Sequence, residues 1–415
     1  MDNDHHVACV DKDDNVEMWT YTECDMNSTE EVKETRGLVK THAGVMVARS
    51  FGYTEEINAE EKETLEKVLS SLFSDVSALS DWKFQYAVEG TLLRLFYHGE
   101  RWYLATHKRL NAFKSRWSCR DSFGDLFVQA LHDILEVASP LEYLQEHLDK
   151  GRVYFFLIRA NSQNRVVCHV HHPRKDSIIF IGWDDPGSVF HPYEEKGTSG
   201  TPILDLFPAP PKPSSEDLSL FYASSPENVA TVLCDYVRQK IDPFEYQGLM
   251  MYHDRKRIKI FHPEYVKFAA VRGNHPNLRF RYLEIRNDPE KVRLFHVLYP
   301  RNTILFEEYE VLLFDIARLI YQFYVLRYIK NQYITLPREE YLVLKKCHQW
   351  YLEDRRHNRL FTQKVLEFVS TEPPLHLYRM IRRRHLEKER SSSSSSTLPP
   401  PLPHRSSFPP LTTIR

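Results

Sequence analysis

Three segments in the first 300 residues have the pattern of two strands joined by a turn, and they constrain the fold more than any other feature. They cover residues 84–105, 153–170 and 248–260. In each segment, two runs rich in apolar and aromatic residues flank a short polar stretch, such as the one around Gly99. Strands joined by short turns pair antiparallel, so these segments predict three antiparallel hairpins.

Helical periodicity dominates from about residue 305. One buried helix face is marked by Leu312, Leu313, Ile316, Leu319, Ile320 and Phe323. Further helical patterns cover 337–369 and 375–389, and earlier ones cover 58–79 and a helix capped by Ser122. The sum predicts the α+β class, with an antiparallel-sheet core and a helical C-terminal domain.

Composition shifts divide the chain into four expected parts. Residues 1–50 are rich in Asp, Glu, Asn and Thr and predict a flexible segment. Residues 51–300 form the core and 301–390 the helical domain. Residues 391–415 are of low complexity, rich in Ser and Pro, and predict a disordered tail.

Charge and composition limit the classes of function. The net charge is −2, so a surface for nucleic acid has to be local. No GxGxxG or GxxxxGK[ST] string is present, so a glycine-rich phosphate loop is not expected. The six cysteines lie far apart and predict free thiols in a reducing compartment. The acidic N-terminus does not resemble a signal peptide, and the apolar stretch 311–326 contains charged residues. We therefore expect an intracellular protein that is neither secreted nor embedded in a membrane.

An acid–glycine pair, Glu89-Gly90, precedes the return strand of the first hairpin and the basic turn at 106–109. Nucleotidyl transfer needs an acid that orients the ribose or a metal, and basic groups that hold phosphates. Glu89 is the candidate for the sugar. The phosphate candidates are Thr106, His107, Lys108 and Arg109. Spacing alone leaves open the alternative of an ordinary half-buried hairpin with a basic rim.

A second basic pattern lies in the third hairpin. Arg255, Arg257 and Lys259 alternate, so they share one face of a strand. Three cations on one face repel each other unless an anion lies there, and phosphate is the natural candidate. The alternative is a solvated edge strand whose charges prevent aggregation.

Two further patterns carry weaker hypotheses. His169 and His171 share a strand face beside Cys168 and His172, but no second ligand pair has a suitable spacing, and we predict no metal site. The basic run 378–390 is typical of a nucleic-acid contact or a nuclear localisation signal, or of a solvated helix end.

The order of these segments resembles that of the covalent nucleotidyltransferases, in particular the RNA ligase-like proteins of large DNA viruses. The resemblance spans roughly residues 80 to 290 and rests on "AVEG" (87–90), "YFFLI" (154–158), "YQGLMM" (246–251) and "RIK" (257–259). It implies an RNA ligase-like core, ATP or GTP with Mg²⁺ as the candidate ligand, and Phe155 or Phe156 as the aromatic contact to a nucleotide. No cofactor is assigned beyond that.

The chain departs from this family at the reacting groups. Ala87 replaces the nucleophilic lysine, Gln247 replaces an acid, and Arg257 replaces a lysine. A methyl group cannot attack a phosphate, and an amide is a poor metal ligand. Lys83 is on the same strand face as Ala87 but about 13 Å away, at roughly 3.3 Å per residue. We therefore expect a scaffold without catalytic residues.

Segments spread over almost the whole chain also resemble the immediate-early protein family of iridoviruses. They include "EGTLLRLFYHGERWYLATHKRLNAFKSRW", "LIRANSQNRVVCH" and "VRGNHPNLRFRYLEIRND". This resemblance implies an early viral protein in the cytoplasm or nucleus of the host cell. Three functions stay open: an inactive scaffold that binds nucleotide or RNA ends, an active ATP-dependent RNA ligase, and a factor that binds unknown viral or host proteins.

Overall fold

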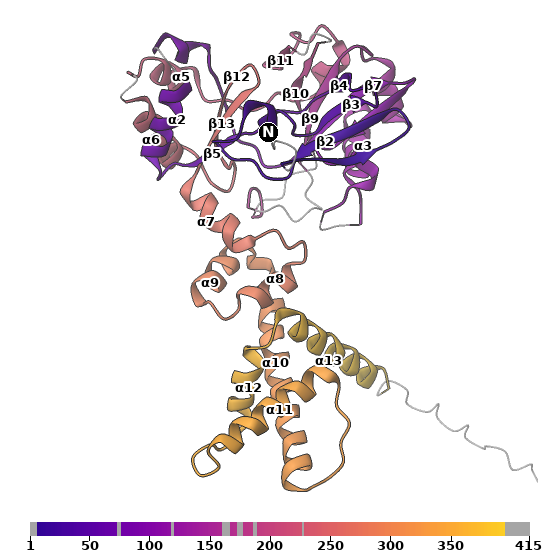
Figure 1. The fold of residues 1–415 in the computed structure, drawn as a ribbon, viewed down its shortest axis with the longest axis vertical. Helices are drawn as coiled ribbons and strands as arrows, with labels where there is room; N and C mark the ends of the chain where they lie inside the picture. Colours follow the sequence, from indigo (N-terminus) through magenta and orange to yellow (C-terminus); the bar gives the residue numbers. More distant parts are fainter. Residues whose placement is uncertain are drawn as a thin grey trace, which may run out of the picture. The chain divides into compact units, whose positions relative to one another are not determined.

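The computed structural model describes residues 6–72, 76–117, 120–159, 167–171, 177–185, 189–225 and 228–394 (Figure 1). The chain divides into two units. The first contains the residues up to 281 together with 289–300, and the second contains 282–288 and the residues from 301 onward. The first unit holds all three sheets and the second is helical, which confirms the predicted α+β class with a helical C-terminal region.

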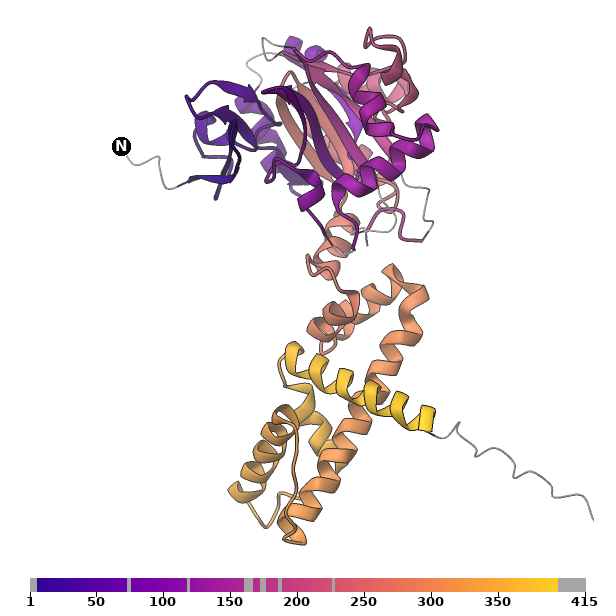
Figure 2. The same cartoon turned by 90° about the vertical axis from the view of Figure 1, so that its right-hand side faces the viewer.

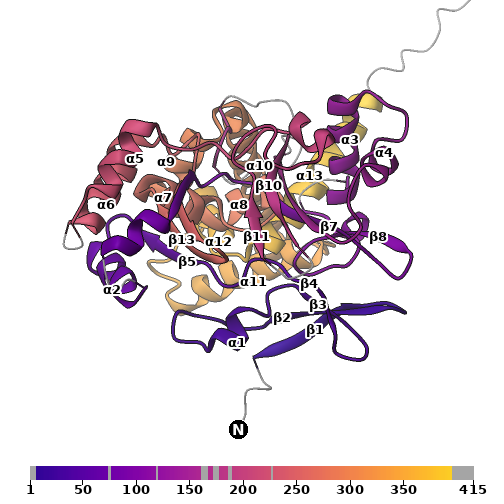
Figure 3. The same ribbon diagram turned by 90° about the horizontal axis from the view of Figure 1, so that it is seen from above.

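The N-terminal residues form a four-stranded antiparallel sheet, indigo in Figures 2 and 3. Its strands are β1 (Val7–Lys12), β2 (Val16–Tyr21), β3 (Leu38–Thr41) and β4 (Met46–Ala48), and helix α1 (Glu30–Lys33) lies between β2 and β3 in the chain. Val16 and Met18 are fully buried against the next sheet. The expectation of a flexible segment over 1–50 is thereby corrected. Apolar residues such as Val16 and Met18 stabilise strands only when a second sheet covers them. The composition of residues 1–50 alone does not show that such a sheet is present.

A five-stranded antiparallel sheet in the order β11-β10-β9-β7-β8 forms the middle of the first unit. Its strands are β7 (Thr91–His98), β8 (Arg101–Ala105), β9 (Val153–Arg159), β10 (Ser177–Asp184) and β11 (Phe190–Pro192). The first predicted hairpin is confirmed by the pairing of β7 with β8. The second is wrong, because β9 pairs with β10 and not with the described residues 167–170 of the expected return strand. Residues 160–166 lie outside the described residues.

The third sheet has the order β5-β13-β12-β6. Its strands are β5 (Glu55–Asn58), β6 (Lys83–Tyr86), β12 (Gly248–His253) and β13 (Lys256–Phe261). The pairing of β12 with β13 confirms the third predicted hairpin, while β5 joins β13 in parallel. The chain therefore crosses from the third sheet to the five-stranded sheet between β6 and β7, at residues 87–90, where a single strand was expected.

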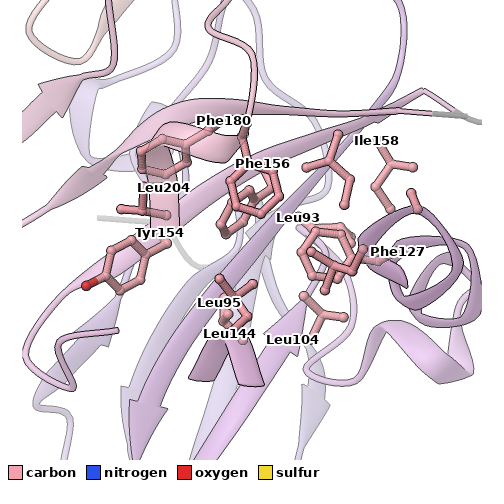
Figure 4. Close-up of a cluster of buried hydrophobic side chains, with 14 of the residues drawn as sticks. Leu93, Leu95, Leu104, Phe127, Leu144, Tyr154, Phe156, Ile158, Phe180 and Leu204 are labelled. Carbon is pink, nitrogen blue, oxygen red and sulfur yellow. The ribbon is translucent and has the colours of Figure 1, made fainter. Parts of the chain in front are cut away.

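Helices cover the sheets on their outer faces. Helices α3 (Phe123–Leu135) and α4 (Pro140–Glu146) pack on the five-stranded sheet over the cluster in Figure 4, in which Phe156 contacts Phe127 and Phe180. The predicted cap is confirmed, because Ser122 accepts a hydrogen bond from Asp125 N at 3.0 Å. Helices α2 (Lys62–Leu72), α5 (Ser215–Tyr222) and α6 (Val229–Lys240) share a core with the third sheet.

The chain continues through α7 (Pro263–Arg272), α8 (Leu278–Ile285) and α9 (Pro289–Leu298). The second unit is built from α10 (Thr303–Tyr324), the π-helical turn Val325–Ile329, α11 (Arg338–Glu353), α12 (Thr362–Ser370) and α13 (Pro374–Ser394). The predicted buried face of α10 is confirmed at Leu312, Leu313, Ile316 and Ile320.

Two predictions concern the end of the chain and membranes. Helix α13 continues through Ser394, past the expected start of the disordered tail at 391, and residues 395–415 lie outside the described residues. Among the described helices, none combines the length and the hydropathy that crossing a bilayer requires.

Candidate functional site

A cavity of about 670 Å³ lies between the five-stranded sheet and the third sheet of the first unit. Strands β7, β9 and β10 contribute one wall, and β6, β12 and β13 contribute another. Its basic lining residues are Arg36, His107, Lys108, Arg109, Lys114, Arg116, Arg257 and Lys259. No Asp or Glu is among the described residues that line it. The excess of positive charge makes this cavity suited to an anion.

Arg257 is the innermost cation of this lining. Its side chain is 7% exposed, and its guanidinium carbon lies 3.4 Å from the centre of the Phe51 ring. Within the described residues it has no hydrogen-bond or ion-pair partner, and its Nε is buried without one. Burial lowers the pKa of Arg257 to about 9, so the group remains cationic at neutral pH. A buried cation without an anion is costly, and an anionic ligand would remove that cost.

Lys259 is two residues further along β13, on the same strand face. Its Nζ lies 3.4 Å from a carboxylate oxygen of Glu56, a half-exposed residue on the neighbouring strand β5. Burial lowers the pKa of Lys259. Arg257 and Lys259 both line the cavity, whereas Arg255, the third cation that was expected on this strand face, does not.

The turn at 106–109 also reaches the cavity, as the sequence suggested. The Thr106 hydroxyl accepts hydrogen bonds from the backbone N–H groups of Lys108 and Arg109, which shapes the turn. Burial, followed by the charges of Arg36 and Lys108, lowers the pKa of His107 to about 4. His107 is consequently neutral at pH 7, and the exposed Lys108 and Arg109 supply the charge of this turn.

Arg36 is a lining residue that the sequence analysis missed. It lies in the turn between α1 and β3 of the N-terminal sheet, just before Gly37, whose φ is +65°. The buried Arg94 holds this turn in place: its Nη1 donates to Gly37 O at 2.6 Å and its Nη2 donates to Thr106 O at 2.8 Å. The run of acidic residues around this segment concealed its role. Lys114 and Arg116, which follow β8 in the chain, also line the cavity and were also missed.

Ala87 and Gln247, the two positions that depart from the ligase pattern, lie beside each other in the cavity wall. Gln247 N donates to Ala87 O at 2.9 Å, and Ala87 N donates to Gly248 O at 2.9 Å. The Gln247 side chain donates to Tyr265 Oη at 2.7 Å. The fold thus brings together two positions that the sequence analysis named separately.

Glu89 does not line the cavity. Its carboxylate is buried and accepts hydrogen bonds from Tyr265 Oη at 2.8 Å and from the backbone N–H groups of Val167 and Cys168. The proposed role of Glu89 in holding a sugar is therefore corrected. This carboxylate also binds the backbone amides that the predicted second hairpin would have used in a strand ladder.

Three other predicted residues are also outside the lining. Arg255 is buried and donates hydrogen bonds to Asp184 Oδ1 and to Ser50 O, each at 2.6 Å. It forms a structural ion pair with Asp184. Phe155 and Phe156 are fully buried on opposite faces of β9. The residue of β9 that lines the cavity is Leu157. Leu157 lies on the same strand face as Phe155, but Phe51 packs against the Phe155 ring, so packing decides which of the two meets the cavity.

The lining suits the phosphates of ATP or GTP but not Mg²⁺. Mg²⁺ is held in proteins through carboxylates and phosphate oxygens. The described lining residues offer no carboxylate, and no group of His, Cys, Asp and Glu in the described part of the chain could hold a metal ion.

His171, one of the two histidines that the sequence analysis considered as metal ligands, contacts Val297 O through its Nε2 at 2.7 Å. His172 lies outside the described residues.

The basic run 378–390 is used mainly inside the second unit. Arg383 forms ion pairs with Glu339 and Glu340, and Lys388 pairs with Asp315. These contacts favour the interpretation of a structural helix end over a nucleic-acid contact.

Comparison with known proteins returns iridovirus relatives. One is an immediate-early protein ICP-46 homolog of Invertebrate iridescent virus 3, 28% identical over 387 residues, which cover 89% of this chain and 79% of the relative. This chain is similar to the immediate-early ICP-46 proteins of iridoviruses. A second ICP-46 homolog, from Invertebrate iridescent virus 6, is 26% identical over 78% of this chain and 68% of its own length. ICP-46 of Frog virus 3 is 26% identical over 48% of each chain. No family model matches the chain.

Among solved structures, the chain is similar to ATP-dependent ligases. An archaeal ATP-dependent RNA ligase has a TM-score of 0.36 and 10% identity over 72% of this chain and 74% of its own. An RNA ligase of Naegleria gruberi has a TM-score of 0.32 and 9% identity over 52% of this chain and 57% of its own. The two resemblances predicted from the sequence, to the iridovirus proteins and to RNA ligases, are the ones that the comparisons return.

Proposed function

We propose that this chain is an immediate-early viral protein that binds a nucleotide or a phosphorylated RNA end in its cation-lined cavity and does not transfer the nucleotide. The observation that carries the proposal is Arg257, a buried guanidinium that faces the cavity and has no anionic partner among the described residues. A phosphate group would supply that partner, because the guanidinium fork matches phosphate oxygens.

Ala87 and Gln247 support the absence of chemistry. Formation of a lysyl-nucleotide needs an amine next to the α-phosphate and a metal that neutralises the developing charge. Ala87 has a methyl group where the amine would be needed. The side-chain amide of Gln247 donates a hydrogen bond to Tyr265 Oη. Lys259, Lys108 and Lys114 also line the cavity. They are the lysines through which the alternative function, an active ATP-dependent ligase, would have to act.

Binding of a 5′-phosphorylated single-stranded RNA to the full chain, measured over a range of salt concentrations, tests the proposal. Each phosphate contact contributes about −0.7 to the slope of log K against log salt. We expect the double variant Arg257→Met, Lys259→Met to bind more weakly and to lower the magnitude of the slope by roughly one to one and a half units. Lys256→Met is the matched control, because Lys256 is an exposed neighbour on the same strand and is outside the lining.

Two results would favour the alternatives. A covalent adduct on any lysine after incubation with ATP or GTP and a divalent metal would establish an active nucleotidyltransferase. Failure of the wild-type chain to bind RNA or nucleotide at low salt would favour a protein-interaction factor with viral or host partners. The proposal places the protein in the cytoplasm or nucleus of the host cell, where RNA ends are accessible.

A further inference from the structure

The second unit carries aromatic and arginine side chains where α10 passes into the π-helical turn. We call this the α10–α11 patch and define it by Arg327 and Tyr328 of the turn, His348 and Tyr351 of α11, and Arg355 just after α11. None of these residues belongs to the cavity of the first unit. A π-helical turn inside or at the end of an α-helix is uncommon and is frequent at functional sites.

The aromatic rings of the patch form a short stack. The Tyr328 and His348 rings are nearly parallel, with centroids 3.7 Å apart and an angle of 8° between their planes. The Tyr351 ring follows at 6.2 Å from His348, with an angle of 25°. Tyr328, His348 and Tyr351 are all partly exposed. A stack of this kind is a preformed surface on which a further flat ring can lie.

Positive charge surrounds the rings. The Arg327 guanidinium carbon lies 5.7 Å from the centre of the Tyr328 ring. Burial, followed by the charges of Arg355 and Arg327, lowers the pKa of His348. Within the described residues neither arginine has an ion-pair partner. The exposed Lys330 follows in the chain and adds to the same charge.

We propose that the α10–α11 patch binds single-stranded nucleic acid, with a base stacked on Tyr328 or Tyr351 and the backbone phosphates on Arg327 and Arg355. Proteins that bind single strands combine aromatic stacking platforms with cations that follow the backbone. A purely structural cluster would account for the packed rings. It would not account for Arg327, which lies near the Tyr328 and Tyr341 rings without an ion-pair partner among the described residues, while these rings remain partly open to solvent. The inference is independent of the cavity, since the two sites belong to different units.

The test uses the full chain with Arg257→Met and Lys259→Met, so that the cavity contributes little. Binding of labelled oligo(U) and oligo(dT) of about 16 nucleotides is measured by fluorescence anisotropy. We expect Tyr328→Ala to weaken binding about tenfold, because it removes a stacking surface. Tyr328→Phe should bind like its parent, since it keeps the ring. Arg327→Gln together with Arg355→Gln should lower the salt slope by about one to one and a half units.

Arg382→Gln is the matched control, because Arg382 is an exposed arginine of α13 in the same unit. Similar affinity for oligo(U) and oligo(dT) would support stacking that does not use the 2′-hydroxyl, and tighter binding of oligo(U) would support the same platform with RNA as its ligand. The proposal is overturned if Tyr328→Ala binds as tightly as its parent or if a duplex binds as tightly as a single strand. It also fails if Arg382→Gln loses as much affinity as the patch variants. Ultraviolet cross-linking of the wild-type chain, followed by peptide mapping, should identify the peptide that contains Tyr328 or Tyr351.

Discussion

The Arg257 guanidinium carbon lies 3.4 Å from the centre of the Phe51 ring, and the group has no anionic partner in the described structure. Phe51 in turn contacts Phe155, with ring centroids 4.7 Å apart. An aromatic face partly compensates a cation for lost water, by roughly 0.5 to 2 kcal/mol, which is less than the cost of burying the charge. The ligand-free protein therefore carries an electrostatic cost that an anion would relieve.

Replacement by methionine should destabilise the protein at Arg255 but not at Arg257. Arg255→Met leaves the buried Asp184 without its partner and should lower the free energy of unfolding by about 3 to 5 kcal/mol. Arg257→Met removes an unpaired buried cation and should leave the stability unchanged or raised. Urea denaturation of the ligand-free variants measures both. Equal destabilisation would mean that Arg257 has a structural partner like that of Arg255.

Ala87→Lys should restore little nucleotidyl transfer. The added amine would lie beside Gln247, and the described lining would still lack a carboxylate for a metal ion. Intact mass after incubation with ATP or GTP and Mg²⁺ should show no adduct on the wild-type chain and at most a trace on the variant. The double variant Ala87→Lys, Gln247→Glu is the informative comparison, and strong labelling of Ala87→Lys alone would contradict this account.

His107 should make the stability depend on pH. Its pKa is about 4 in the folded chain and 6.5 in its ordinary state, so the unfolded chain binds more protons between these values. The contribution of His107 is complete above about pH 6.5 and is lost as the pH falls toward 4. Thermal melting of wild type and His107→Gln over this range measures it. The variant should lose stability less steeply on acidification, and parallel curves would show that His107 is not buried.

Gly37 should tolerate alanine much less than Gly44 does. Both have positive φ, so both substitutions carry a similar backbone strain. A methyl group at Gly37 would meet His107 Cα and Arg94 Nη2 at 3.0 Å, whereas a methyl group at Gly44 would meet nothing within 4 Å. We expect Gly37→Ala to cost about 1 to 3 kcal/mol more than Gly44→Ala in urea denaturation. Gly37→Ala should also weaken RNA binding, because it displaces Arg36 and the 106–109 turn.

Ser122→Ala should lower the free energy of unfolding by about 1 kcal/mol, because it removes the N-cap of α3. Ser122 Oγ accepts from Asp125 N, and Asp125 Oδ2 accepts from Ser122 N at 2.8 Å. Ser219→Ala, at an exposed position inside α5, is the control and should change stability by less than about 0.5 kcal/mol. If Ser219→Ala lowered the free energy of unfolding as much as Ser122→Ala, the loss could not be attributed to the N-cap.

Local patterns in the sequence determined the elements whose cause is local. The cap at Ser122, the hairpin turn at Gly99 and the helical periodicity of 312–320 each depend on neighbours within a few residues, so their prediction needed no tertiary information. The same holds for the alternation that places Arg257 and Lys259 on one strand face.

Only the tertiary structure decided which face of each strand meets the cavity. Glu89, Arg255 and Phe155 have the residue types of a nucleotide site, but each is buried in contacts with distant segments: Tyr265, Asp184 and Phe51. Arg36 shows the reverse, since it comes from a stretch with no visible pattern and reaches the cavity because Arg94 ties Gly37 to Thr106. The sequence gives the chemistry of each side chain and the spacing at which residue types repeat along a helix or strand. The residues that bury a charged side chain or pair with it lie far away in the sequence. The free energy of the charged group depends on those residues.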